Sequence, residues 1–149
     1  MPDRRQEIID TYRQMRAGLT AALDGLSEAQ MLDRSLGEWC VKDILAHIAM
    51  WDELRVTEIE RVAAGGRSVF LDMHDSDAFN DAVAAMRWDV PLTQVRWEFD
   101  YTRRRLLEAI ERAPASAIDD SLYGHAPLLS RHDEAHTEQI IEWRKERGI

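Results

Sequence analysis

The sequence predicts an all-α protein, in the form of an antiparallel four-helix bundle with one additional short helix. Two observations lead to this prediction. Apolar residues recur at alternating steps of three and four along several long segments, and no segment shows sustained alternation with hairpin turns. A chain of 149 residues without an internal repeat or a linker suits one core, so we expect a single domain over residues 1–149.

Each expected helix is amphipathic, and most are bounded by a residue that caps or breaks a helix. Gly25 follows the first apolar stripe, and Pro91 suits the first turn of the fourth helix. Ser76 or Asp77 can cap the short third helix. The expected helices cover residues 3–26, 41–64, 76–87, 91–112 and, approximately, 127–147. The segment 67–75, "RSVFLDMHD", is ambiguous and could be a loop.

Composition argues against several classes of partner. The formal net charge is −9, which argues against a nucleic-acid partner and against binding to an anionic membrane surface. No stretch approaches the roughly 20 apolar residues of a transmembrane helix, and the charged start "MPDRRQEIID" lacks the apolar core of a signal peptide. We therefore expect a cytoplasmic protein. Cys40 is the single cysteine, so no internal disulfide can form.

Two histidines near the C-terminus are the strongest chemical feature. His132 and His136 lie four residues apart on the apolar stripe of the last expected helix. At this spacing their Cβ atoms are about 5–6 Å apart, so both imidazoles can bind one metal ion. The alternative is that they are surface histidines or hydrogen-bonded core histidines. Burying polar groups without partners costs about 1–3 kcal/mol each, and a metal is one candidate for compensation.

A third ligand should come from another helix, and His47 is the natural choice. It lies in "DILAHIAMW", beside Ile44 and Ile48 on the core face. Alone, it would be interpreted as a satisfied core histidine, but three histidines with open positions are typical of a catalytic metal site. His74 and His125 lie in expected loops, where exposure is the simpler interpretation. His125 is close enough in sequence to the last helix to be kept as a candidate on the substrate side.

Three segments carry a resemblance to a known family. "GEWCVKDILAHIAMWDE" resembles the second-helix signature of the DinB/YfiT-like superfamily, and "RHDEAHTEQIIEW" resembles its last-helix signature. "DAFNDAVAAMRW" is similar to the Phe-Asn stretch of the branch that includes the colibactin self-protection proteins. The resemblance implies a four-helix bundle with a divalent metal bound by His47, His132 and His136. It also makes Asn80 a candidate polar contact in the site.

The sequence departs from the family pattern at Cys40, where a serine usually follows the motif tryptophan. A thiol is a weaker cap than a hydroxyl, so we expect a poorer helix start. Cys40 precedes His47 by about 10 Å along a helix, which favours a buried structural thiol over a metal ligand. Asp43, one turn before His47, is a candidate to orient its imidazole. Asp133 and Glu134 are expected on the solvated face.

Aromatic and basic side chains add further candidates for the surroundings of the site. Trp39, Trp51 and Trp143 either line the pocket or pack in the core. The basic run 103–105 could meet an anionic cofactor, although a solvated or ion-paired face is the simpler interpretation.

Characterised members of the superfamily that the sequence resembles include low-molecular-weight thiol S-transferases, a mycothiol-dependent isomerase and colibactin-protection hydrolases. A metal held by three neutral imidazoles keeps its charge and can activate a bound water or thiol. We therefore expect an enzyme that acts on a small electrophilic molecule by thiol S-transfer or hydrolysis. The metal could be Zn, Ni, Fe or Mn, a low-molecular-weight thiol could take part, and a homodimer is compatible. The alternatives are a bundle that sequesters a metal or small ligand without turnover, and a helical interaction protein whose histidines only pack.

Overall fold

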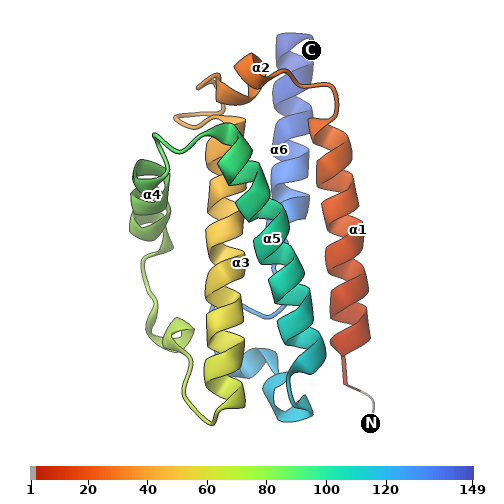
Figure 1. Ribbon diagram of the computed structural model, residues 1–149, viewed down its shortest axis with the longest axis vertical. Coiled ribbons are helices and arrows are strands. Elements are labelled where there is room, and N and C mark those ends of the chain that lie inside the picture. Colours follow the sequence, from red (N-terminus) through yellow and green to blue (C-terminus); the bar gives the residue numbers. More distant parts are fainter. Residues whose placement is uncertain (1–2) are drawn as a thin grey trace.

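A computed structural model describes residues 3–149, which form six α-helices joined by loops and three short 3₁₀ turns (Figure 1). The described residues contain no β-strand, so the predicted all-α class is confirmed. None of their helices is long and apolar enough to cross a membrane. The elements are α1 (Arg5–Leu23), α2 (Glu28–Leu32), α3 (Val41–Ala63), η1 (Val69–Asp72), α4 (Ser76–Met86), α5 (Leu92–Arg112), η2 (Ala115–Ala117), η3 (Asp120–Tyr123) and α6 (His132–Arg147).

The four long helices α1, α3, α5 and α6 lie side by side, with α4 against the outer side of α3 (Figure 1). α3 packs mainly against α5, and α1 packs mainly against α6. The two helices of each pair run in the same direction (Figure 1), which differs from the expected antiparallel order. The reason is the long connection through η1 and α4, which returns the chain to the start of α3 before α5 begins.

Two buried apolar clusters fill the interior, and a layer of buried charges separates them. One cluster includes Leu19, Ile44 and Phe99, and the other includes Ile8 and Leu106. Along each long helix a charged residue lies between the two clusters or at the helix start. These residues are Arg16 on α1, Asp52 on α3, Arg103 on α5 and Asp133 on α6.

The main differences from the expected elements are an additional helix and a later start of the last helix. α2 is an unpredicted helix, started by Ser27, whose hydroxyl accepts from the Gln30 N–H while the Gln30 side chain accepts from the Ser27 N–H. α6 begins at His132 rather than near Pro127. The preceding loop uses side chains as partners instead of helical bonds: the Ser130 N–H donates to the Tyr12 hydroxyl at 2.9 Å, and Tyr12 donates to a loop carbonyl.

Candidate functional site

The three predicted metal-binding histidines lie together between α3 and α6. His47 comes from the middle of α3, His132 is the first residue of α6, and His136 follows one turn later. The ring centroid of His47 is 5.0 Å from that of His132 and 5.3 Å from that of His136. The centroids of His132 and His136 are 6.1 Å apart. α3 and α6 therefore bring the three imidazoles close to one another.

Burial keeps two of these imidazoles neutral at physiological pH. Burial lowers the pKa of His47 to about 4, assisted by the neighbouring His136 and Arg55. Burial likewise lowers the pKa of His132 to about 3, assisted by the charge of Arg55 and by the other two histidines. A neutral imidazole keeps one ring nitrogen free as a lone-pair donor. The Nδ1 atom of His47 is buried without a hydrogen-bond partner in the described chain.

His136 has a defined ring orientation although it is only partly buried. Its Nδ1 atom lies 2.9 Å from Oε1 of Gln139, one turn further along α6. With the amide oxygen as the acceptor, Nδ1 is the donor of this contact, and the tautomer with its proton on Nδ1 leaves the lone pair of Nε2 free. This is the arrangement that a neighbouring acceptor gives to a histidine ligand in metal sites.

The donor chemistry of the cluster fits a metal, but the side chains do not yet converge on one point. Three imidazoles bound to one ion at about 2.0–2.1 Å in tetrahedral geometry have ring centroids about 5 Å apart. Two of the three separations meet this value, and the His132–His136 separation is wider. Within residues 3–149 no group of three or more His, Cys, Asp or Glu side chains is placed so that it could hold a metal ion. The metal site therefore stays a prediction.

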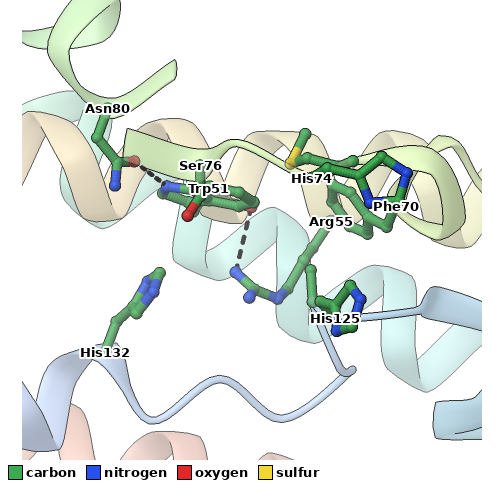
Figure 2. Close-up of a pocket in the computed structure, with 10 residues that line it drawn as sticks. Trp51, Arg55, Phe70, His74, Ser76, Asn80, His125 and His132 are labelled. Atoms are coloured by element: carbon green, nitrogen blue, oxygen red, sulfur yellow. Dashed lines mark hydrogen bonds between the residues drawn. The ribbon is translucent and has the colours of Figure 1, made fainter. Parts of the chain in front are cut away.

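A cavity of about 420 Å³ opens beside His132, within the range of about 300–1,000 Å³ typical of small-molecule sites (Figure 2). Its walls come from α3, from η1 and the start of α4, and from the loop before α6. Four lining side chains are apolar and six are polar. The lining residues are Trp51, Arg55, Phe70, Met73, His74, Ser76, Asn80, His125, Ala126 and His132.

The cavity contains two of the three candidate catalytic residues. Asn80 lies in its wall, where its Oδ1 atom accepts a hydrogen bond of 2.8 Å from the indole N–H of Trp51 (Figure 2). His125 also lines the cavity from the loop before α6, as does the exposed His74. The expectation that His74 is only an exposed loop residue is therefore incomplete, because the connection that contains it folds over the same cavity.

Asp43, the third candidate, makes no hydrogen bond to His47 among the described residues and instead fixes the start of α3. Its Oδ2 atom accepts from the Cys40 backbone N–H at 3.0 Å and from Arg34 at 2.7 Å, and the Cys40 thiol lies 3.3 Å away. The expected role of Asp43 in orienting His47 is thus wrong. The carboxylate supplies the capping bond that the Cys40 position needs, and Cys40 is a buried free thiol, as expected.

A buried ion network begins at Asp133, the residue that follows His132 on α6. Oδ2 of Asp133 accepts from Arg16 at 2.7 Å and from Arg103 at 3.0 Å, and Arg103 also donates to Asp52 at 2.9 Å. The expectation that Asp133 lies on the solvated face is wrong, because the late start of α6 turns it inward; Glu134 is exposed as expected. Of the basic run 103–105, only Arg103 is buried.

The three candidate tryptophans have different surroundings. Trp51 lines the cavity, and Trp39 lies with its ring centroid 5.4 Å from that of His47. Trp143 is buried in the apolar core, where its indole N–H donates to Ser35 at 2.9 Å.

Arg55 is a buried charged residue of the cavity that was not predicted from the sequence. Only 4% of it is exposed, and its side chain reaches from α3 into the cavity (Figure 2). The sequence did contain a pattern that could have identified Arg55: His47, Trp51 and Arg55 follow one another at intervals of four residues. Residues four apart share a helix face, so a residue two turns after His47 belongs to the same side of α3.

Comparison with known proteins identifies the family. No curated protein and no solved structure matches the chain. The family model described as the DinB superfamily matches residues 11–140, a region that includes all three clustered histidines and most of the cavity-lining elements. The match covers far more than half of the 149 residues, and the chain belongs to the DinB superfamily.

Proposed function

We propose that the protein is a divalent-metal-dependent enzyme that acts on a small electrophilic molecule by thiol S-transfer or hydrolysis. The observation that carries the proposal is the meeting of three imidazoles beside a cavity of about 420 Å³. His47, His132 and His136 would hold the metal, and a modest rotation of the partly exposed His136 would bring the rings closer. When bound, the metal would lower the pKa of a coordinated water or thiol.

The side chains of this chain supply the remaining functions of such a site. Burial holds His47 and His132 in the neutral form that a metal requires. The apolar walls of the cavity exclude water from a bound molecule. Asn80 fixes the indole of Trp51, which forms one of these walls, through the 2.8 Å hydrogen bond. The pocket accepts a molecule of limited size, and one side of that molecule would face His132.

Metal content tests the histidine cluster before any substrate is known. Untagged protein, loaded with each of Zn, Ni, Fe and Mn and then desalted, should retain about one metal per chain by elemental mass spectrometry. His47→Ala and His136→Ala should abolish retention, because two imidazoles make a poor site. His74→Ala is the matched control, since it removes a histidine that lines the cavity outside the cluster. Equal metal content in all variants would reject the assignment.

Turnover separates the enzyme from a protein that sequesters a metal or small ligand. The metal-loaded protein would be incubated with model electrophiles, with and without a low-molecular-weight thiol, and products would be detected by mass spectrometry. An S-conjugate indicates transfer, and a hydrolysed product without thiol indicates hydrolysis. Metal retention without any turnover would favour the sequestering alternative.

A further inference from the structure

Arg55 places a positive charge at the cavity that no carboxylate of the described chain neutralises. It is 4% exposed, and the ion pairs found among residues 3–149 do not include it. Its Nε donates to the Pro127 carbonyl at 3.0 Å, and its Nη1 donates to the Trp51 carbonyl at 3.4 Å. A guanidinium group carries five N–H donors, so three have no protein acceptor in the described chain.

The nearby ion network cannot supply the missing negative charge. Asp52, close enough to feel the charge of Arg55, already accepts from Arg103 and lies 3.6 Å from Arg16. Asp133 is likewise held by Arg16 and Arg103. The buried guanidinium groups of Arg55 and Arg103 and the partly buried one of Arg16 therefore face two carboxylates, which leaves one positive charge in excess. An uncompensated buried charge is costly, so its presence at a cavity points to a negatively charged ligand.

The rest of the cavity wall agrees with this interpretation. None of the ten lining residues is acidic, although the chain contains 28 Asp and Glu against 19 Lys and Arg. Ser76 and Asn80 add polar side chains that can bind an anionic group. Trp51, Phe70 and Met73 provide an apolar surface for the rest of a ligand. The cavity thus combines a cationic end with apolar walls inside an acidic protein.

We propose that this cavity binds a small organic anion, a molecule with an apolar body and a carboxylate or similar group that Arg55 holds. The inference names the charge class of the ligand for the proposed active site, and in that sense it rests on the proposed function. The anion binding itself depends on Arg55 and not on a metal. The anion-binding proposal and the proposed metal-dependent function can therefore fail independently of each other.

Benzoate and benzamide form a matched pair of probes, alike in shape and different in charge. Each would be titrated into the full-length protein after dialysis against a chelator, at constant ionic strength, while the indole N–H signal of Trp51 is followed by NMR. We expect a saturable shift with benzoate and affinity for benzamide about tenfold lower or weaker still. Absence of a saturable benzoate shift, or equal affinity for both probes, would overturn the proposal.

Arginine variants locate the charge that benzoate recognises. Arg55→Gln should lower benzoate affinity about tenfold or more, while leaving benzamide binding unchanged. Arg55→Lys keeps the charge and should retain part of the affinity, which covers the case in which Arg55→Gln does not fold. Arg104→Gln removes the same charge from an exposed position on α5 and should bind like the wild type. Benzoate binding that survives Arg55→Gln would reject Arg55 as the anion partner, whatever the metal experiments show.

Discussion

Replacing Asp133 with Asn tests the buried ion network that joins the four long helices. Asp133 is 1% exposed, and its carboxylate receives two hydrogen bonds from Arg103 and one from Arg16. Burial raises the pKa of this carboxyl, but the two guanidinium groups more than offset it and leave the pKa below its usual range. The group is therefore charged at pH 7, and the substitution leaves the buried guanidinium groups with one carboxylate fewer.

The expected loss of stability is large. Removing one partner of a buried ion pair costs about 3–5 kcal/mol, because a buried charge is left uncompensated. For a chain of this size each kcal/mol corresponds to about 2–4 °C, so the melting temperature should fall by about 6–20 °C. Urea unfolding followed by circular dichroism at 222 nm would give the change in the free energy of unfolding, and a thermal scan would give the shift in melting temperature.

Glu134→Gln is the matched control for this experiment. Glu134 is the next residue in the first turn of α6, so both substitutions remove one negative charge from the same helix N-terminus. Its partner is Arg131 at 2.8 Å, and both side chains are about half exposed or more. An exposed pair contributes roughly 0–1 kcal/mol. If Asp133→Asn destabilises the protein no more than Glu134→Gln does, the network contributes nothing specific and the reasoning is refuted.

Three further predictions concern the loops and the histidines. Tyr12→Phe should destabilise the protein by about 1–3 kcal/mol in urea unfolding, since it leaves the buried Ser130 N–H without an acceptor. Gly124→Ala should also destabilise it, by about 1–3 kcal/mol, because φ is +60° there and an added Cβ would lie 2.7 Å from a backbone oxygen of η1; an unchanged melting temperature would contradict this. In chelator-treated protein, His47 and His132 bind protons below about pH 6.5 when the chain is unfolded. In the folded state, burial lowers their pKa values to about 4 and about 3. The free energy of unfolding should therefore fall as pH drops from about 6.5 toward 4, and a flat profile over that window would argue against buried neutral imidazoles.

The apolar pattern was sufficient to predict the main helices but not how they connect. On α5, the apolar residues that recur at steps of three and four are buried, including Val95, Leu106 and Ile110. Periodicity reports only which face of a helix is covered, and it says nothing about the direction of its neighbours. The parallel α3 and α5 arise from the intervening connection (Figure 1). The path of this connection depends on tertiary contacts, such as the hydrogen bonds that the Ser68 hydroxyl and the Val69 N–H donate to the buried Glu58.

The candidate site was also only partly predictable, because sequence spacing shows which residues share a helix face but not where their side chains point. His132 and His136 were visible because their spacing is local, and His47 because it replaces an apolar residue on a core face. Asp43 was misassigned because a carboxylate one helical turn before a histidine can point either toward that histidine or toward the start of the helix. The backbone N–H of Cys40, unsatisfied at the start of a helix, is the partner it takes. The choice depends on side-chain rotamers, which spacing does not specify.

The late start of α6 explains why the ion network and the histidine cluster occur together. Because the Tyr12 hydroxyl accepts from the Ser130 N–H, the loop stays non-helical up to His132, and α6 begins where α1 holds the loop. Asp133 then points into the charged layer while His132 points to the cavity beside His47. The buried charges are costly to desolvate, and well-packed apolar residues could give equal or greater stability. Apolar residues lack directional pairing, and we infer that the pairing of Asp133 with Arg16 and Arg103 orients α6 and with it both histidines.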